Sequence, residues 1–273
     1  IPRILLAMLV GSGLAGSGAA FQSLFGNPLA TPDTLGVATG ASFGAVLFLL
    51  LSNNMLLVQV GAVVFGLVAL GITALISRTK NGASFLMVIL AGMVVGALFN
   101  ALISLVKYAA DPSDKLPAIT FWLMGSMTRA TFKNLMMCIP FIASGLTLLW
   151  LLRWRLNVLS LPDDEAKSIV PNVRSLRNCV MVSATLCTAA AVALCGQVGW
   201  IGLLVPHMAR MIYGSDNRKI LPASLAIGAT LMVVIDTIAR SILAAEIPVS
   251  ILTAMVGAPL FIGLLRKTGG AEL

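Results

Sequence analysis

The sequence predicts an all-α protein that crosses a membrane many times. Its mean hydropathy is +1.00, and 59% of its 273 residues are hydrophobic, whereas only 10% are charged. Soluble domains carry about 25% charged residues, so this chain has too few charges to cover a water-exposed surface. Uncharged intervals reach the roughly 17–25 residues that a helix needs to cross a bilayer; they are 4–32, 34–77, 81–106, 134–152, 178–209 and 247–265.

The first four expected helices lie within residues 4–108, and a polar turn follows each of them. The first helix is rich in glycine, and small residues of this kind let helices pack closely in a membrane. The expected spans are 4–25, 34–52, 55–77 and 84–108, and the turns are 26–33, 52–54, 77–82 and 107–117.

The second half of the chain contains four further expected spans and one short apolar piece. The spans are 135–152, 178–195, 220–242 and 248–266. The short piece, 197–209, is interrupted by Gly199, Gly202 and Pro206, which favours a short broken helix or a partial crossing. Phe121 and Trp122 precede the fifth span and suit a membrane interface. We expect residues 1–273 to form one transmembrane domain.

The longest hydrophilic interval is Leu159–Arg177, which we call the platform. Its charged residues are Asp163, Asp164, Glu165, Lys167, Arg174 and Arg177. The three acids follow Pro162 and fall in the first turn of a short helix, where negative charge complements the helix dipole. Pro171 cannot donate an amide and disfavours helix in the residue before it, so we expect two short amphipathic helices joined at this proline. Such a segment either contacts a partner in the aqueous phase outside the membrane or is an ordinary connecting loop.

The positions of the basic residues predict a topology. The net charge is +8, but the Lys and Arg residues lie between the apolar spans, which argues against a nucleic-acid partner. With the platform in the cytoplasm and 197–209 counted as a short crossing, twelve basic residues fall inside and six outside. This asymmetry follows the positive-inside rule. It places Ile1 outside and the C-terminus inside, with nine crossings.

No residue pattern for catalysis stands out, so we do not expect an enzyme. His207 lies beside a proline with no Cys or acidic residue at ligand spacing, which favours a structural role. The cysteines, all within apolar segments, are Cys138, Cys179, Cys187 and Cys195. We expect packed thiols, no metal site and no cofactor in this chain. No Gly-rich loop ends in Lys-Ser or Lys-Thr, so the chain has no recognisable ATP site.

Three polar residues in or beside the spans are candidates for function. Asp236 and Arg240 stand four residues apart on one expected helix and can pair. Such a pair serves either packing or contact with an external partner. Asn100 either lines a polar path or forms a hydrogen bond across a helix interface.

A series of motifs along nearly the whole chain resembles the FecCD-type permeases. These are membrane subunits of binding-protein-dependent ABC importers for iron-siderophores, haem and cobalamin, and some relatives move molybdate or tungstate. The matching segments are Ile1–Arg3, Ser17–Gln22, Asn27–Ala30, Leu35–Ala41, Leu90–Gly92, Trp122–Ser126, Gly199–Arg210, Asp236–Arg240, Glu246–Ser250 and Gly257–Phe261. Any one motif is weak evidence, but the complete series in order is specific.

The resemblance implies an assembly in the bacterial inner membrane. The family has ten helices per subunit, so the first helix would be absent from this chain. Two permease copies, expected here as a homodimer in the lipid, work with two cytoplasmic ATPases that hold ATP and Mg. A periplasmic binding protein delivers the cargo.

The resemblance also implies roles for particular residues. Residues 160–176 match the coupling helices that dock into the ATPase, so the charges of the platform become docking contacts. Arg3 and Arg240 match outer-rim arginines that pair with glutamates of the binding protein.

The family's translocation path runs along the subunit interface, lined by the helix equivalent to 84–108 and by the last helix. Asn100 falls on this path, and Ser84, Phe85 and Leu86 match its cytoplasmic gate. The relatives carry small hydroxyl residues at the gate, so Phe85 is a departure that suits a small cargo such as an oxyanion.

We therefore expect the permease subunit of an importer for a metal chelate or a metal oxyanion, working by ATP-driven alternating access. The alternative is an ATP-independent secondary transporter or channel. That alternative requires ionisable residues at mid-membrane as coupling sites, and the spans offer little there besides Asn100.

Overall fold

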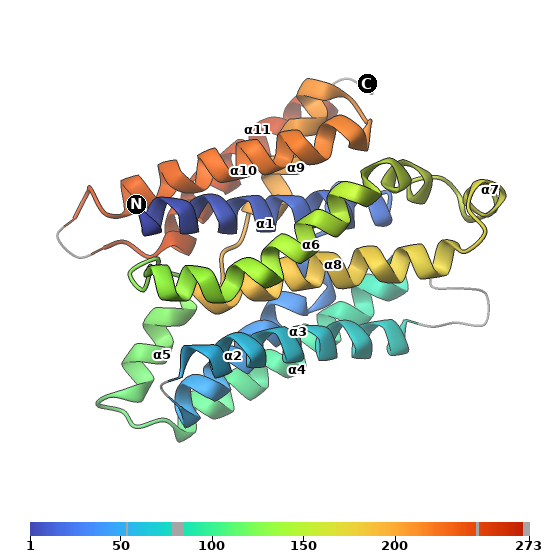
Figure 1. The fold of residues 1–273 in the computed structure, drawn as a ribbon. Helices are drawn as coiled ribbons and strands as arrows, with labels where there is room; N and C mark the ends of the chain where they lie inside the picture. Colours follow the sequence, from blue (N-terminus) through green and yellow to red (C-terminus); the bar gives the residue numbers. More distant parts are fainter. Residues whose placement is uncertain (53, 78–84, 244–245, 270–273) are drawn as a thin grey trace.

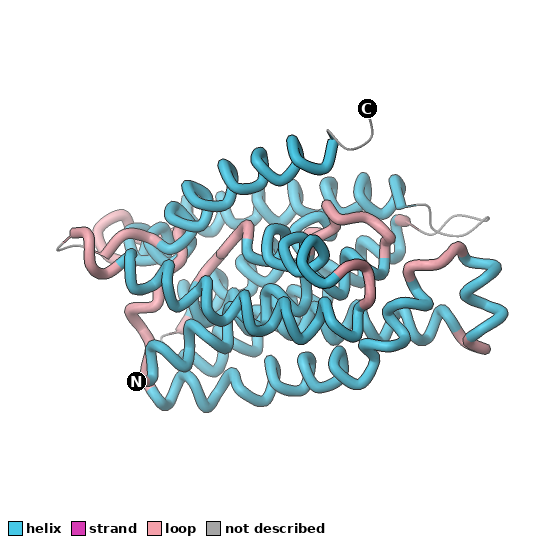
Figure 2. Tube along the Cα trace, turned by 90° about the horizontal axis from the view of Figure 1, so that it is seen from above, coloured by secondary structure: helices cyan, strands magenta, loops and turns pink. Residues whose placement is uncertain are grey.

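The computed structural model describes residues 1–52, 54–77, 85–243 and 246–269, and these are helical with no strand among them. This confirms the predicted all-α class. In chain order the elements are α1 (Pro2–Leu24), η1 (Pro32–Leu35), α2 (Val37–Leu51), α3 (Met55–Ile76), α4 (Phe85–Ala109), α5 (Lys115–Leu123), α6 (Phe132–Leu159), α7 (Asp163–Ile169), α8 (Val173–Cys195), α9 (Ile201–Tyr213), α10 (Asn217–Ala239) and α11 (Val249–Gly269). Figure 1 and Figure 2 show most of these helices running side by side.

Helix lengths agree with a membrane-spanning bundle. Within the described residues, six helices are long and apolar enough to cross a membrane: α1, α3, α4, α6, α8 and α10. α2 and the apolar part of α11 are shorter. α9 has 13 residues and is therefore only about 20 Å long at 1.5 Å per residue. The expected short helix is thus confirmed, but it begins at Ile201 rather than at 197 and continues through Pro206 to Tyr213.

α1 lies at the centre of one group of helices. It packs against α6, α8, α9 and α10, and in Figure 1 it runs between α10 and α8. Glycines bring the backbones into contact, because no space for a Cβ exists between Gly11 and the carbonyl of Gly228, or between Gly18 and the carbonyl of Gly202. The glycine-rich first span therefore packs as the sequence predicts.

α2, α3 and α4 form a second group on the other side of α8. α8 packs against both α1 and α3 and so belongs to both groups. Three aromatic rings join the helices of the second group, with Phe43 lying 4.9 Å from Phe65 and 5.7 Å from Phe99 between ring centroids. The Phe43–Phe65 contact is edge-to-face and the Phe43–Phe99 contact is tilted, and such ring pairs add to the stability gained by burying apolar area.

Two helices extend further than the apolar runs predict. α6 continues to Leu159, well beyond the expected 135–152. The charge of Arg153 interrupts the apolar run from which the span was predicted, but the backbone stays helical past it. Its guanidinium lies over the ring of Trp150, 4.3 Å from the centroid, so the aliphatic stem stays packed while the charge reaches water. Likewise the second platform helix is not separate, since Val173–Cys195 forms one continuous helix.

Two other differences concern local turns. The expected span 34–52 begins with the short 3-10 helix η1, whose N-cap Thr31 and Thr34 bond each other's backbone in a capping box. Residues 115–123, where we expected the end of a polar turn followed by the interface aromatics Phe121 and Trp122, form the helix α5. Trp122 of this helix is buried, whereas Phe121 is exposed.

The glycine contacts yield a matched comparison. Gly11→Ala places a methyl group against the backbone of α10, and overpacking of this kind costs roughly 1–3 kcal/mol. Gly71→Ala is the control, because no atom lies within 4 Å of the added methyl group. In detergent we expect the melting temperature to fall by several degrees for Gly11→Ala and to stay level or rise for Gly71→Ala. Equal melting temperatures would refute the close contact.

Candidate functional site

The platform presents charges to water at one end of the molecule. In Figure 1, α7 lies at the right-hand end, beyond the long helices. Asp164, Glu165 and Lys167 are exposed, and the Lys167 ammonium lies 3.5 Å from the Asp164 carboxylate. The side chain of Asp163 lies outside the described residues. Ala166 is fully buried in a cluster of apolar side chains from α6 and α8, so α7 is anchored on one face and open on the other.

The second part of the platform is the first turns of α8. Asn172 caps this helix by accepting a hydrogen bond from the Ser175 amide at 2.9 Å. Val173 and Leu176 are buried, whereas Arg174 is exposed and Arg177 is half-buried. Because α8 is continuous through the bundle, movement of these arginines is movement of a whole spanning helix.

A polar network lies beneath the platform. The Ser160 hydroxyl donates to the carbonyl of Ser23 at 3.0 Å, and the Ser23 hydroxyl donates to the side-chain oxygen of Asn217 at 2.6 Å. The Asn157 side chain accepts a hydrogen bond from the Asn217 amide at 2.8 Å and donates one to Asp216 at 2.8 Å. The hydrogen bond from Asn157 lowers the pKa of the Asp216 carboxyl below its usual range.

Arg210 extends this network to α9. Its guanidinium donates to the side-chain oxygen of Gln22 and to the hydroxyl of Ser23. The ends of α1, α6 and α9 and the start of α10 are thus joined next to the platform. The sequence reasoning missed these residues. A pair of polar residues, Gln22 and Ser23, at the end of an apolar span was the available signal.

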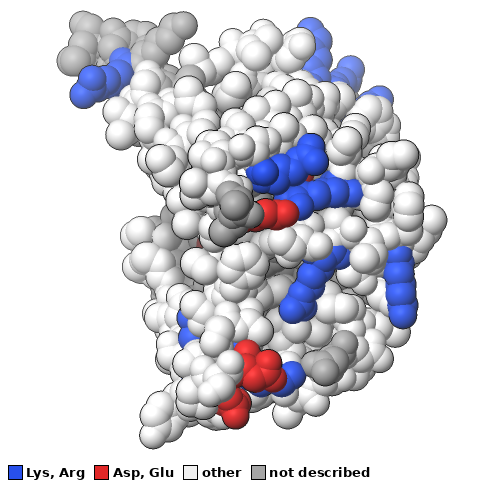
Figure 3. All heavy atoms as spheres, turned by 90° about the vertical axis from the view of Figure 1, so that its left-hand side faces the viewer, with Lys and Arg blue, Asp and Glu red and all other residues white. Residues whose placement is uncertain are grey.

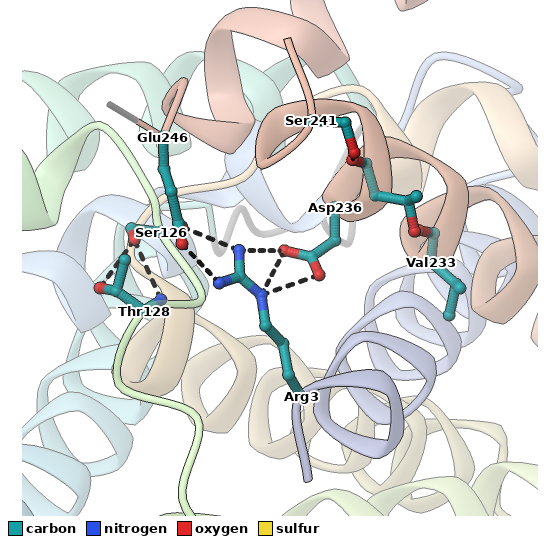
Figure 4. Close-up of polar contacts among 8 residues, drawn as sticks. Arg3, Ser126, Thr128, Val233, Asp236, Ser241 and Glu246 are labelled. Carbon is teal, nitrogen blue, oxygen red and sulfur yellow. Dashed lines mark hydrogen bonds and ion pairs between the residues drawn. The ribbon is translucent and has the colours of Figure 1, made fainter. Parts of the chain in front are cut away.

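Arg3 holds a cluster of charges at the opposite end of the molecule. Figure 4 shows its guanidinium between two carboxylates. Its Nε donates to both oxygens of Asp236 at 3.0 and 2.9 Å, and its terminal nitrogens bond Asp236 at 2.7 Å and Glu246 at 2.7 and 2.8 Å. These contacts join the start of α1, the end of α10 and the segment before α11. The hydrogen bonds from Arg3 lower the pKa of Glu246.

The expected pairing of Asp236 with Arg240 is wrong. The Asp236 side chain is 4% exposed and faces Arg3, whereas Arg240 is exposed at the C-terminal cap of α10. Among the described residues no ion pair includes Arg240. Residues four apart lie on one face of a helix, so Asp236 could have met Arg240. The planar guanidinium of Arg3 forms several hydrogen bonds to the Asp236 carboxylate at once, and Asp236 therefore pairs with this residue distant in sequence. Figure 3 looks onto this end, where basic side chains gather around an acidic one.

A cavity of about 240 Å³ lies between these two ends. It is lined by parts of α1, η1 and α8 and by the non-helical stretch before α9, including Leu14, Asp33, Thr188 and Trp200. Leu14 lies near the middle of α1. Asp33 is the only ionisable residue of the lining, its side chain is exposed, and its carboxylate has no hydrogen-bond partner among the described residues. The sequence reasoning treated Asp33 as part of a turn and missed it.

The residues expected along a translocation path lie on or near α4. Asn100 and Leu86 are exposed on that helix. Phe85 begins the helix, but its side chain lies outside the described residues, as does Ser84 as a whole. Of the two roles considered for Asn100, a hydrogen bond across a helix interface is not seen among the described residues, which offer its side chain no partner.

Groups for metal binding or nucleophilic chemistry are not assembled in the described residues. No three His, Cys, Asp or Glu side chains there are grouped so that they could hold a metal ion. Cys138, Cys187 and Cys195 are buried free thiols, as expected. The His207 ring lies 6.2 Å from that of Phe261 between centroids, which is a packing contact.

Comparison with known proteins supplies the family. A model described as the FecCD transport family matches residues 1–267. The molybdate import system permease protein of Haemophilus influenzae is 42% identical over 98% of this chain and 79% of that protein. The hemin transport system permease protein of Yersinia pestis is 37% identical over 98% of this chain and 81% of that protein. A solved structure of a metal-chelate-type ABC transporter in an inward-facing conformation aligns with a TM-score of 0.91 and 41% identity, covering 97% of this chain and 85% of that one.

Replacement by alanine is expected to affect stability differently at Arg3 and at Arg240. Arg3→Ala leaves two carboxylates without a partner, and breaking a buried ion pair costs roughly 3–5 kcal/mol. The cost is smaller here because Glu246 is 31% exposed. We expect a clear loss of thermal stability in detergent for Arg3→Ala and no change for Arg240→Ala.

A triple variant tests the origin of that loss. Adding Asp236→Asn and Glu246→Gln to Arg3→Ala removes the unpaired charges, so part of the stability should return. Equal melting temperatures for Arg3→Ala and the intact protein would contradict a stabilising role for the contacts of Arg3.

Proposed function

The chain belongs to the FecCD transport family, and we propose that it is the permease subunit of a binding-protein-dependent ABC importer. The proposed cargo is a metal chelate of the iron-siderophore, haem or cobalamin class, or a metal oxyanion such as molybdate or tungstate. The observation that carries the proposal is the family match over residues 1–267. The placement of two charged surfaces at opposite ends of one helical bundle supports it, because an importer of this kind needs one partner on each side of the membrane.

The platform is the proposed contact with the ATPase, which would hold ATP and Mg. Its docking residues are Asp163, Asp164, Glu165, Lys167, Arg174 and Arg177. The buried Ala166 supports this role, because it anchors α7 in the apolar core beside α6 and can pass on a displacement of α7. The polar network from Ser160 to Arg210 would carry the same displacement to α1, α9 and α10. ATP-driven alternating access then follows from rigid-body movement of packed helices.

The outer charge cluster is the proposed contact with the binding protein. Arg240 is exposed and forms no ion pair among the described residues, although its charge also acts on Glu246, so a carboxylate of the partner can reach it. Arg3, by contrast, is already engaged with Asp236 and Glu246. We assign direct contact with the binding protein to Arg240. Arg3 could contact the binding protein only by sharing or giving up its hydrogen bonds to Asp236 and Glu246.

The path is proposed to run between two copies of this chain. α4 presents a largely exposed apolar face, and Asn100 lies on it. An amide facing lipid is costly, so this face is better suited to a partner helix or an aqueous path. Ser84, Phe85 and Leu86, at the platform end of α4, would form the cytoplasmic gate of such a homodimer.

These assignments place the protein in the bacterial inner membrane. The platform and the C-terminus would lie in the cytoplasm, and the Arg3 cluster would face the periplasm. Twelve basic residues inside against six outside, counted from the sequence, support this orientation.

One observation favours the alternative of ATP-independent transport. Secondary transporters need an ionisable group at membrane depth, and Asp33 in the central cavity is such a group. The two functions differ in whether a cytoplasmic ATPase binds the chain.

The ATPase contact can be tested by co-purification. We expect the chain, co-expressed with its candidate ATPase, to retain that partner in a detergent pull-down, and Asp163→Ala with Asp164→Ala and Glu165→Ala to weaken retention several-fold by removing docking charges. Asp111→Ala with Asp114→Ala is the matched control, because these acids lie on another loop. Failure of the intact chain to retain any ATPase would favour the secondary transporter, and equal retention by both variants would move the docking contacts elsewhere.

The binding-protein contact predicts a separable defect. Arg240→Glu should reduce the affinity of the purified transporter for its binding protein at least ten-fold, since it replaces an attraction by a repulsion, while the melting temperature stays unchanged. Surface plasmon resonance measures the first quantity. Arg129→Glu, on another exposed loop of the same chain, is the charge-matched control. An unchanged affinity for Arg240→Glu would remove this residue from the interface.

A further inference from the structure

A second pocket, of about 520 Å³, lies where several helices begin or end. Its lining comes from the last turn of α2, the first residue of α3, the start of α5, the turn before α6 and the first turn of α6. In Figure 1 the start of α6 lies at the same end of the molecule as the N-terminus, so the pocket belongs to the end that carries Arg3. Its volume falls within the roughly 300–1,000 Å³ of small-molecule sites.

The pocket lies at the depth of the lipid headgroups. α3 begins at Met55, which lines the pocket, and has 22 residues. It is therefore about 33 Å long, close to the roughly 30 Å of the hydrocarbon core, so its first residue reaches the surface of the bilayer. Apolar side chains, each 41–48% exposed, continue from there along α3 at every fourth position: Leu56, Val60, Val64 and Val68. Residues four apart are neighbours on a helix surface, so an acyl chain can follow this stripe away from the pocket.

Arg129 brings a positive charge with unused hydrogen-bond donors to the pocket. A guanidinium has five N–H donors, and that of Arg129 contacts the thioether sulfur of Met55 at 3.8 Å, which is a weak acceptor. The side chain is exposed, and no ion pair among the described residues includes it. Such a guanidinium can donate two parallel hydrogen bonds to a phosphate.

Asp114 brings a negative charge to the same pocket. It is the N-cap of α5, where an aspartate usually accepts a hydrogen bond from an amide of the first turn, but its side chain forms no such bond. The carboxylate is exposed and takes part in no ion pair of the described residues. Lys115 adds a second positive charge to the lining, and Leu49 and Ile119 add apolar surface. Figure 3 shows side chains of both signs on this end of the molecule.

We propose that this pocket binds the headgroup of a phospholipid that carries ethanolamine, with Arg129 holding the phosphate and Asp114 holding the ammonium. A zwitterion matches a lining with charges of both signs, whereas a headgroup with negative charge alone is repelled by the carboxylate. The primary ammonium donates hydrogen bonds to Asp114, which the quaternary ammonium of choline cannot do. The bound lipid would join the ends of α2, α3, α5 and α6. This inference goes beyond the proposed function and depends on neither cargo nor ATPase.

Native mass spectrometry of the purified full chain tests the headgroup preference. The protein is titrated in detergent with phosphatidylethanolamine, phosphatidylcholine and phosphatidylglycerol that carry the same acyl chains. We expect the ethanolamine lipid to bind roughly two- to five-fold more tightly than the other two, as for one partly exposed ion pair. Asp114→Asn should abolish this preference. Equal affinities in the intact chain, or a preference that survives in Asp114→Asn, would overturn the proposal.

Asp111→Asn is the matched control for that variant. Asp111 lies on the same turn but outside the lining, and an asparagine there keeps an oxygen that can accept the hydrogen bond from the Asp114 amide. We expect the control to keep the preference for ethanolamine. Loss of the preference in both variants would assign it to the general charge of the turn and would overturn the site.

The phosphate contact is tested with Arg129→Gln. This variant should weaken the binding of all three lipids about five-fold, because each carries the phosphate and one basic residue near a membrane surface has an effect of this size. Lys133→Gln is the matched control, since Lys133 is exposed at the start of α6 but does not line the pocket. An equal loss in both variants would indicate general attraction to the surface and would overturn the site.

Two other occupants are distinguished by separate measurements. O-phosphoethanolamine has the charges of the headgroup without acyl chains, and it should bind at least about ten-fold more weakly because it buries less apolar surface. Equal binding would assign the pocket to a soluble zwitterion instead of a lipid. Arg129→Glu should leave the affinity for the binding protein unchanged, and a loss there would assign the pocket to that protein. Failure to retain an ATPase would refute the proposed function without affecting these results.

Discussion

Direct contact between helix backbones is the constraint on which this structure depends. In a bilayer, apolar side chains gain little by leaving lipid for a helix interface, so association relies on close packing. Gly11 places α10 against α1, and Gly18 places the start of α9 against α1. The first contact positions the end of α10, where Asp236 meets Arg3. The second positions the start of α9, which forms one wall of the central cavity. The contacts of Arg3 and the wall of the cavity therefore both depend on glycines of α1, which carry no side chain.

The sequence predicted features set by neighbouring residues, such as the long helices, and missed contacts between residues far apart in the chain. Apolar runs located the long helices because each charged residue separately raises the free energy of placing a segment in the membrane. The same signal misjudged α6, since Arg153 marks the edge of the apolar run while the helix continues to Leu159. The family motifs identified the platform and both outer arginines as candidates. They did not show that Arg3 already holds two acids, because that pairing joins residues more than two hundred positions apart.

Asp33 was missed for a related reason. It follows a run of turn residues and precedes an apolar span, so sequence patterns place it in a connecting loop. Only the fold shows that this connection lies near Leu14, in the middle of α1, where both residues line one cavity. The alternatives left open for Asn100 narrowed in the same way. The structure leaves this amide exposed on α4, and the described residues offer it no partner.

The Arg3 cluster has a consequence for how the protein is made. Arg3 enters the membrane with the first helix of this chain, whereas Asp236 and Glu246 are synthesised 233 and 243 residues later. The cluster closes only after α10 has been inserted with its C-terminal end on the same side as Arg3. A chain that stops earlier, or whose later helices enter in the wrong direction, keeps an unpaired arginine at the rim. Insertion of α10 in the correct direction is thus registered at Arg3.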